Sequence, residues 1–182
     1  MIITSSYFIG ERNIPNTLHD DVASILNNLI SVHEVEYLNA LLGYELNKLF
    51  TAGIGEVIPE AKWTDLLNGV EFTARNGQLM KWTGFKNTTT YNSPVADYVF
   101  YKWLKNNATQ LASMGEVQTE NENSTPVSSA HRMAKAWNNM VELNKTLYEF
   151  ILTKPDEYPS FLTNTGTRDC RNLFTKINAY NF

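Results

Sequence analysis

Cysteine is nearly absent from this sequence, because Cys170 is its one thiol. A single cysteine excludes an internal disulfide framework and leaves no second thiolate for a cysteine-based metal site. Such a composition suits a protein that assembles in a reducing cytoplasm. Cys170 lies between Asp169 and Arg171, and no base that could activate it as a nucleophile is identifiable from the sequence. We therefore interpret it as a bystander thiol.

Long apolar runs and basic runs are also missing. No stretch of roughly eighteen consecutive apolar residues occurs, and the start MIITSSYFIG has neither the basic n-region nor the long apolar core of a signal peptide. We expect neither export by the general route nor a membrane-spanning segment. The formal net charge is -4 and no basic run stands out, which argues against a protein that reads duplex nucleic acid.

The motifs of the common catalytic and cofactor-binding families are missing too. The sequence holds no GxxxxGK[ST], no GxGxxG after a strand, no GxSxG and no HExxH. Its three histidines, His19, His33 and His131, lie in different segments. His33 and Glu36 stand one helical turn apart, as in helical di-iron sites, but such a site needs further carboxylates from other helices. We predict a surface pair here, no metal or cofactor site, and no enzymatic activity.

What the sequence does contain is enough apolar material for one folded domain. Its 182 residues are 43% apolar and 12% aromatic, so large side chains should carry much of the burial. A first helix is predicted after Asn16 or Thr17, either of which could cap it, with Asp20 and Asp21 near its positive N-terminal end. Its predicted apolar face consists of Leu18, Val22, Ile25, Leu26 and Leu29.

A glycine interrupts the leucine-rich segment EYLNALLGYELNKLF, residues 36–50. Helical spacing continues straight through it along Val35, Leu38, Leu42, Leu46 and Leu49. Inside a helix, Gly43 would cost roughly 1 kcal/mol relative to alanine, so a structural reason for it is expected. It either allows close approach of another helix, or it separates two helices as a kink or C-cap. Both alternatives stay open.

Alternation of apolar and polar residues predicts a β-hairpin near residues 70–82. The predicted strands contain Val70, Phe72 and Ala74 before the turn and Leu79 to Trp82 after it. Between them, Asn76-Gly77 is a strong short-range hairpin signal. We therefore expect a hairpin inserted between helices.

Two longer helices are predicted in the second half of the chain. Pro94 stands at the first helical position of one, whose wide apolar arc over residues 95–111 is typical of a central helix or of one shared between a core and an interface. Residues 113–125 hold three glutamates and no basic residue, which predicts a solvated loop. The next helix, which begins after Pro126, carries a stripe of Ala130, Met133, Trp137, Met140, Asn144, Leu147 and Ile151. Asn144 either fixes the register of a helix pair or points at water.

Together these segments predict a mainly α fold, a bundle of about four helices with an inserted β-hairpin and an extended C-terminal arm. We expect one helical domain over residues 1–154 and an arm over residues 155–182 that packs on its own domain or on a neighbour. The four tryptophans are Trp63, Trp82, Trp103 and Trp137. They could form a stacking platform for bases or sugars, but positions in a core or a subunit contact are favoured.

The order of these segments is more informative than any one of them. Over residues 14–153, an Ile-Pro start leads into an acidic helix, YLNALLGYELNKLF, a hairpin, SPVADYVFYKWLKNNATQLASMGEVQ and SSAHRMAKAWNNMVELNKTLYEFI. This layout resembles the head-tail connector proteins of tailed bacteriophages, and it is closest to the small helical neck-ring adaptors of phages that infect Bacteroidetes, including the crAss-like group. LLGYEL resembles the leucine-glycine-aromatic joint of that family, and MGEVQ followed by AWN strengthens the likeness. Residues after Lys154 lie outside it.

The resemblance implies a virion protein without catalysis. Such proteins form a ring, commonly twelvefold, that docks under the portal protein, extends the DNA channel and presents a surface for the next neck or tail protein. The ring would assemble in the host cytoplasm, remain in the virion neck, and let genomic DNA pass without sequence-specific binding. The wide arc of residues 95–111 and the stripe of residues 130–151 would supply apolar surface for subunit contacts.

The resemblance also implies roles for particular residues. Gly43, Trp103 and Trp137 would be structural, with Gly43 at a sharp joint. The hairpin, the acidic loop and the C-terminal arm are expected to reach neighbours, unless they are plain solvent-exposed connections. The residues expected at these contacts are Phe72, Asn76, Gly77, Leu79, Glu116, Glu120, Glu122, Arg168, Arg171, Phe174, Tyr180 and Phe182.

A second hypothesis of a different class stays open. The chain could be a small helical enzyme or ligand-binding domain that uses an aromatic-rich cavity between the two long helices of its second half. The absence of paired acids, metal-ligand spacings and phosphate loops argues against the enzyme. The stripe over residues 130–151 would serve a partner-binding module equally well. Self-association discriminates between these hypotheses, because a ring protein should form a closed oligomer or assemble on a portal.

Overall fold

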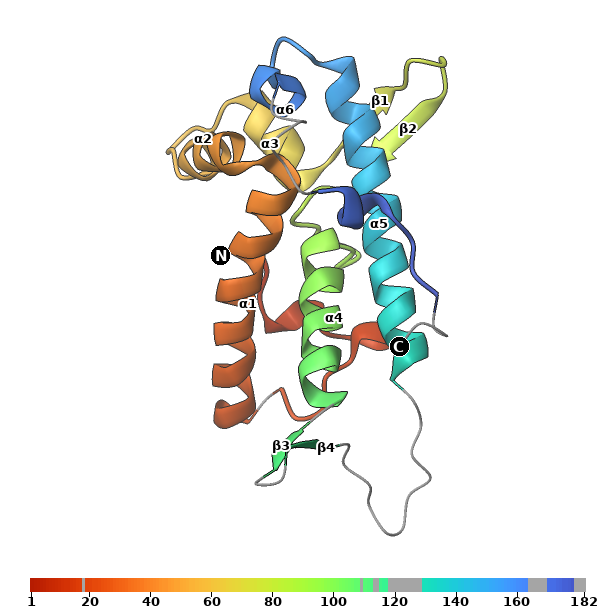
Figure 1. The fold of residues 1–182 in the computed structure, drawn as a ribbon. Helices are drawn as coiled ribbons and strands as arrows, with labels where there is room; N and C mark the ends of the chain where they lie inside the picture. Colours follow the sequence, from red (N-terminus) through yellow and green to blue (C-terminus); the bar gives the residue numbers. More distant parts are fainter. Residues whose placement is uncertain (18, 109, 113–114, 118–128, 164–169, 179–182) are drawn as a thin grey trace.

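Three long helices lie side by side and give the molecule its elongated shape (Figure 1). They are α1 (Asp20–Leu42), α4 (Pro94–Ala108) and α5 (Ala130–Thr153). The structure is a computed structural model, and it describes residues 1–17, 19–108, 110–112, 115–117, 129–163 and 170–178. The predicted fold class, mainly helical with a two-stranded antiparallel hairpin between helices, is confirmed.

Helix α4 is the central helix of the bundle and contacts both α1 and α5. Every residue from Pro94 to Phe100 is buried. The stripe on α5 is buried in the same core at Met133, Met140, Asn144, Leu147 and Ile151. The wide apolar arc therefore belongs to a central helix, the first of its two interpretations. The bundle itself covers the arc on α4 and the stripe on α5. The prediction that these two surfaces supply apolar area for contacts between subunits is therefore wrong.

Gly43 is the joint between α1 and α2 (Tyr44–Ile54). Its φ of 81° and ψ of 154° lie in a region that essentially only glycine occupies. The Gly43 N–H donates to the Asn39 carbonyl at the end of α1, and the Gly43 carbonyl accepts from the Asn47 N–H as α2 begins. Gly43 therefore separates two helices, the second of the two alternatives, and α2 turns away across the end of the bundle (Figure 1).

The predicted hairpin follows directly after a short helix. The elements are α3 (Ala61–Asn68), β1 (Val70–Thr73) and β2 (Leu79–Trp82). The two strands pair antiparallel along their whole length. At the tip, Gly77 has a φ of 82° and its N–H donates to the Ala74 carbonyl at 2.8 Å, so a positive-φ glycine closes the turn. The hairpin prediction is confirmed at its predicted position.

A second, shorter hairpin follows α4. Its strands are β3 (Gln110–Ala112) and β4 (Gly115–Val117). The prediction of a solvated loop over residues 113–125 is therefore wrong for β4, and the predicted helix over residues 95–111 ends earlier, at Ala108. Strands of three residues are too short to produce a readable alternation of apolar and polar residues.

Residues 1–17 cross the bundle in an irregular segment with two short 3-10 turns, Ser5–Tyr7 and Gly10–Arg12. The segment buries Ile2, Ile3, Tyr7, Phe8 and Ile14. Its start is held by the buried carboxylate of Glu34 on α1, which accepts from the Ile2 N–H at 2.8 Å and from the Ile3 N–H at 3.2 Å. This N-terminal segment is part of the core, although its sequence has no periodic apolar pattern that would predict it.

The described part of the C-terminal arm packs on its own chain. Helix α6 (Pro159–Thr163) contacts α2, and the Tyr158 hydroxyl just before it donates to the Lys62 carbonyl at 2.7 Å. A final 3-10 turn, Arg171–Phe174, lies along α5 with Leu173 buried. These residues therefore complete the core of the helical domain. Of the two expectations for the arm, packing on its own domain holds for its described residues.

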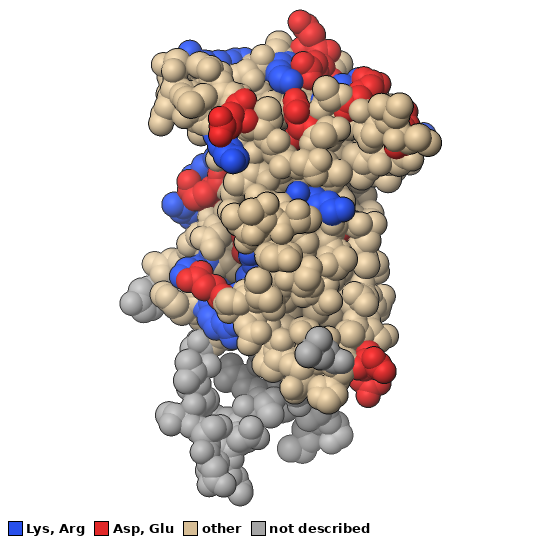
Figure 2. Space-filling view, turned by 180° about the vertical axis from the view of Figure 1, so that it is seen from behind, with Lys and Arg blue, Asp and Glu red and all other residues tan. Residues whose placement is uncertain are grey.

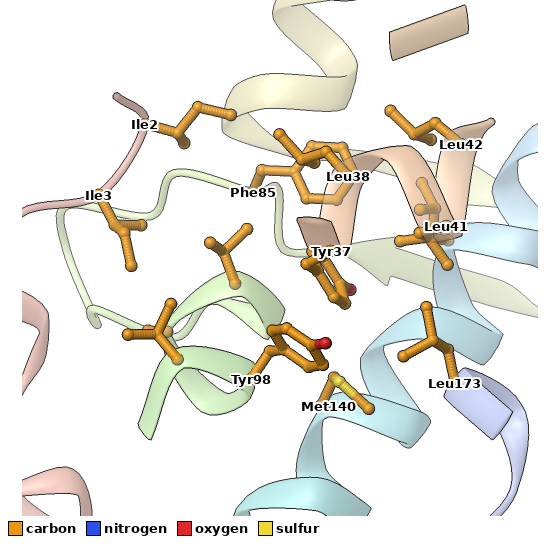
Figure 3. Close-up of a cluster of buried hydrophobic side chains, with 14 of the residues drawn as sticks. Ile2, Ile3, Tyr37, Leu38, Leu41, Leu42, Phe85, Tyr98, Met140 and Leu173 are labelled. Atoms are coloured by element: carbon orange, nitrogen blue, oxygen red, sulfur yellow. The ribbon is translucent and has the colours of Figure 1, made fainter. Parts of the chain in front are cut away.

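Side chains from four parts of the chain meet in the middle of the core (Figure 3). Tyr37 of α1, Tyr98 of α4, Met140 of α5 and Leu173 of the C-terminal turn point toward one another. Asn144 is fully buried beside them. The Tyr37 hydroxyl donates to Asn144 Oδ1, and Asn144 Nδ2 donates to the Leu173 carbonyl at 2.8 Å. Asn144 therefore fixes the register of α5 against α1 and the C-terminal turn.

Candidate functional site

The hairpin places its predicted contact residues on two faces. Phe72 is buried, with its ring 5.4 Å from that of Phe150 on α5. Because successive strand residues point to opposite faces, this position turns inward, and Phe72 is a core residue instead of the exposed contact that the sequence analysis expected. Asn76 and Gly77 lie exposed at the tip, and Leu79 is 70% exposed. These three residues are accessible to another chain.

The other predicted contact residues are spread over the acidic loop and the arm. Several lie outside the described part of the chain, namely Glu120, Glu122, Arg168, Tyr180 and Phe182. The backbone of Glu116 lies in β4. Arg171 is exposed, whereas Phe174 is half-buried with its ring 5.9 Å from that of Tyr148 on α5. Among the described residues of the arm, Arg171 is thus the predicted contact residue that stays accessible.

All four tryptophans make contacts within the single chain. Trp63 and Trp82 are buried in its core. Trp103 is half-buried and stacks on Phe100 with the ring centres 6.0 Å apart. The Trp137 ring lies 4.8 Å from that of Tyr101, and its Nε1 donates to a backbone carbonyl at 2.8 Å, that of Thr175 in the C-terminal segment. These contacts agree with core positions and leave no row of exposed rings among the described residues.

An exposed apolar strip runs along the outer side of α1. Ile25, Val32 and Val35 are 66%, 56% and 53% exposed, and we name these three residues the α1 face. Their helical positions lie opposite the buried residues of α1 and span about 15 Å of helix. No Asp, Glu, Lys or Arg occurs between Val22 and His33. Figure 2 accordingly shows a flank without charged atoms along the middle of α1.

Two residues of the α1 face lie where the sequence pattern does not predict them. Ile25 and Val35 were expected on the apolar faces that turn inward, but both lie in solvent. The core side of α1 instead uses Leu26, Ile30, Tyr37, Leu38, Leu41 and Leu42. A regular α-helix of 23 residues can bury one face only, and its apolar positions exceed that face.

A second exposed apolar feature lies at the other end of the molecule. Val57 and Ile58, in the connection between α2 and α3, are 100% and 84% exposed, and we name them the 57–58 tip. Tyr44 and Leu49 on α2 are 74% and 50% exposed. These exposed aliphatic side chains contribute little to the monomer's own core, so covering them by another molecule would be favourable.

The His33 and Glu36 pair fastens helices together. His33 Nδ1 lies 2.6 Å from one Glu36 carboxylate oxygen, and the other oxygen accepts from the Tyr98 hydroxyl at 2.8 Å and from Lys102 Nζ at 2.9 Å. Partial burial opposes ionisation of Glu36, but the hydrogen bonds from Lys102, His33 and Tyr98 outweigh it and lower the pKa of Glu36 to about 2. The carboxylate thus stays charged and links α1 to α4.

A cavity of about 470 Å³ lies between α4, α5, residues 9–12 and the loop before α4. It occupies the position that the second hypothesis named, but most of the residues that line it are polar or charged. Phe100 lines it, whereas Trp103 and Trp137 do not. The helix α5 contributes His131, Arg132 and further residues one and two turns later. The volume lies in the range of small-molecule sites.

An ion pair between the half-buried Arg12 and the buried Asp97 closes one side of this cavity. Arg12 Nη1 donates to Asp97 Oδ1 at 3.0 Å, and Arg12 Nη2 donates to the Tyr91 carbonyl at 2.5 Å. Burial raises the pKa of Asp97 to about 6, although Arg12 favours the charged form. The other carboxylate oxygen is buried without a hydrogen-bond partner in the described residues. Asp97 looks in the sequence like an ordinary acidic residue of a first helical turn, so the pair was not predicted.

Two further observations concern sites that sequence patterns suggested or opposed. Within the described ranges, no three His, Cys, Asp or Glu side chains come together in a group that could hold a metal ion. Among the described helices, none has both the length and the hydropathy needed to cross a bilayer.

Comparison of the chain with protein-family models, curated proteins and solved structures finds no match.

Proposed function

We propose that this chain is a structural subunit of the neck of a tailed bacteriophage, where it forms a ring between the portal protein and the next neck or tail protein. The protein would be located in the virion, where it would extend the DNA channel without catalysing a reaction. The proposal starts from the order of segments over residues 14–153, which resembles the phage head-tail connectors. With a formal net charge of -4, such a ring would offer genomic DNA no general attraction as it passes.

The observation that carries the proposal is the pair of exposed apolar surfaces on different elements. A ring contact is heterologous, so each subunit needs two different patches that fit each other. The α1 face is an uncharged helical strip, and the 57–58 tip is a small projection with two aliphatic side chains. Subunit interfaces are depleted of charge at their centres, which the α1 face matches. We assign the α1 face to one side of the ring contact and the 57–58 tip to the other.

Portal binding would use surfaces that remain accessible after the ring has closed. The hairpin tip with Asn76, Gly77 and Leu79 is one such surface, and Arg171 on the C-terminal segment is another. Phe72 does not belong to the residues proposed for portal binding, because it is buried in the core. We therefore expect substitutions at the hairpin tip to weaken portal binding without changing contacts between subunits.

Light scattering on matched variants tests the assignment of the α1 face. Val32→Glu places one negative charge in the middle of that face, and Thr64→Glu places the same charge on an exposed position of α3. Both variants and the unmodified protein are measured over a concentration series, alone and with a candidate portal. We expect Val32→Glu to abolish assembly and Thr64→Glu to leave it intact. Equal assembly of both variants would remove the α1 face from the ring contact.

A further inference from the structure

Among the described residues that line the cavity between α4 and α5, three cations face two carboxylates. Glu11 accepts from Lys135 Nζ at 2.6 Å, and Asp97 is paired with Arg12. Arg132 faces no carboxylate among the described residues, since its Nη2 donates to two backbone carbonyls of the N-terminal segment at 3.2 and 3.3 Å. A chain with a formal net charge of -4 thus carries a locally positive cavity.

Arg132 is held in place before any ligand arrives. Its guanidinium carbon lies 5.1 Å from the ring centre of Phe100, and the two bonds to backbone carbonyls anchor it on the N-terminal segment. Both carbonyl contacts use Nη2, so Nε and Nη1 keep hydrogen-bond donors for another partner. A guanidinium that is already ordered loses little entropy on binding, which favours recognition of a carboxylate or a phosphate.

Other polar side chains around the cavity have unused hydrogen-bonding capacity. Asn92 from the loop before α4 and His131 and Asn139 from α5 all line it. Their side chains make no hydrogen bond to the described part of the chain. Asn side chains can donate and accept, so they suit the hydroxyl and carbonyl groups of a polar organic molecule.

We propose that this cavity binds a small organic anion. Arg132 would hold its carboxylate or phosphate group, and Asn92 and Asn139 would bind its polar remainder. The volume of about 470 Å³ is larger than a bare inorganic ion needs and falls within the range of small organic ligands. The proposal does not depend on the ring function, because none of the residues that line the cavity belongs to the surfaces assigned to assembly.

Titration of the nitrogen-15-labelled full chain with matched pairs of probes tests the proposal by NMR. Glucose 6-phosphate is compared with glucose, and succinate with succinamide, so that each anion has a neutral analogue of similar shape. Inorganic phosphate reports the strength of the anionic group alone. We expect saturable shifts at residues 90–97 and 131–139 for at least one organic anion, and none for its neutral analogue. Which of the two anions binds more tightly distinguishes a phosphate ligand from a carboxylate ligand.

Three variants locate the site. Arg132→Gln is expected to weaken binding about tenfold or more, because it removes a charged donor. Asn139→Leu should also weaken binding because it removes the amide that would bind the polar remainder, and it leaves the Arg132 contacts to the N-terminal segment intact. Lys48→Gln removes the same charge from an exposed position on α2 and should change nothing. The proposal is overturned if no probe gives saturable shifts up to about 10 mM, or if Arg132→Gln and Asn139→Leu both bind as the unmodified protein does.

Discussion

Replacement of Asn144 by leucine gives the sharpest test of how the core is specified. Asn144 is fully buried and serves two groups, as acceptor for the Tyr37 hydroxyl and as donor to the Leu173 carbonyl. Leucine has the same branching and the same number of side-chain heavy atoms as asparagine, but it can do neither. Each buried polar group left without a partner costs about 1–3 kcal/mol, so Asn144→Leu should lower the free energy of unfolding by about 2–6 kcal/mol. That is a large share of the ~5–15 kcal/mol stability of an ordinary domain.

A double-mutant cycle measured by urea unfolding isolates the shared hydrogen bond. Tyr37→Phe removes the hydroxyl that Asn144→Leu would leave without a partner, so the double variant should be about 1–2 kcal/mol more stable than the sum of the single effects implies. Tyr158→Phe supplies the control, since its hydroxyl bonds to the Lys62 carbonyl and shares no partner with Asn144. Its effect should add to that of Asn144→Leu within about 0.5 kcal/mol. Additivity in the Tyr37 cycle as well would show that the hydrogen bond between Tyr37 and Asn144 does not contribute to stability.

Three more predictions concern the backbone, pH and the C-terminal segment. Gly43→Ala should lower the free energy of unfolding by about 1–3 kcal/mol in urea titrations, because its φ of 81° and ψ of 154° strain any residue with a Cβ; an unchanged midpoint would contradict the assignment of the joint. Because folding raises the pKa of Asp97 to about 6, the folded state binds more protons near pH 5, and this group should raise the free energy of unfolding by about 1 kcal/mol as the pH falls from 7 to 5. The gain should be missing in Asp97→Asn. Trp137→Phe removes the donor to the Thr175 carbonyl and should speed tryptic cleavage after Lys176, whereas equal cleavage rates would show that this bond does not hold the segment.

The elements that the sequence predicts well are those with a local signal. The Asn76-Gly77 turn and the alternation around it fix the hairpin because a positive-φ glycine closes the turn. The stripe on α5 is predictable because heptad spacing brings Met133, Met140 and Leu147 to one face of a helix. The position of the break at Gly43 is visible too, but the sequence does not decide between a joint and a close approach, since both need a missing Cβ.

Other features depend on contacts between distant segments and leave no local pattern. Arg12 and Asp97 are 85 residues apart in sequence, and no sequence pattern near either residue predicts their ion pair. Ile2 and Ile3 pack in the core as part of an irregular segment, which has no period to detect. The exposure of Val32 is equally hidden, because an apolar residue on a helix is expected inside until the neighbours that cover the other face are known.

Direct imaging of assembly tests the central claim, the ring in a phage neck. The purified protein, alone and mixed with a candidate portal, is examined by negative-stain electron microscopy together with its mass from light scattering. We predict closed rings, or rings that form only when the portal is present. A monomer of 20.7 kDa that does not bind the portal under either condition would contradict it.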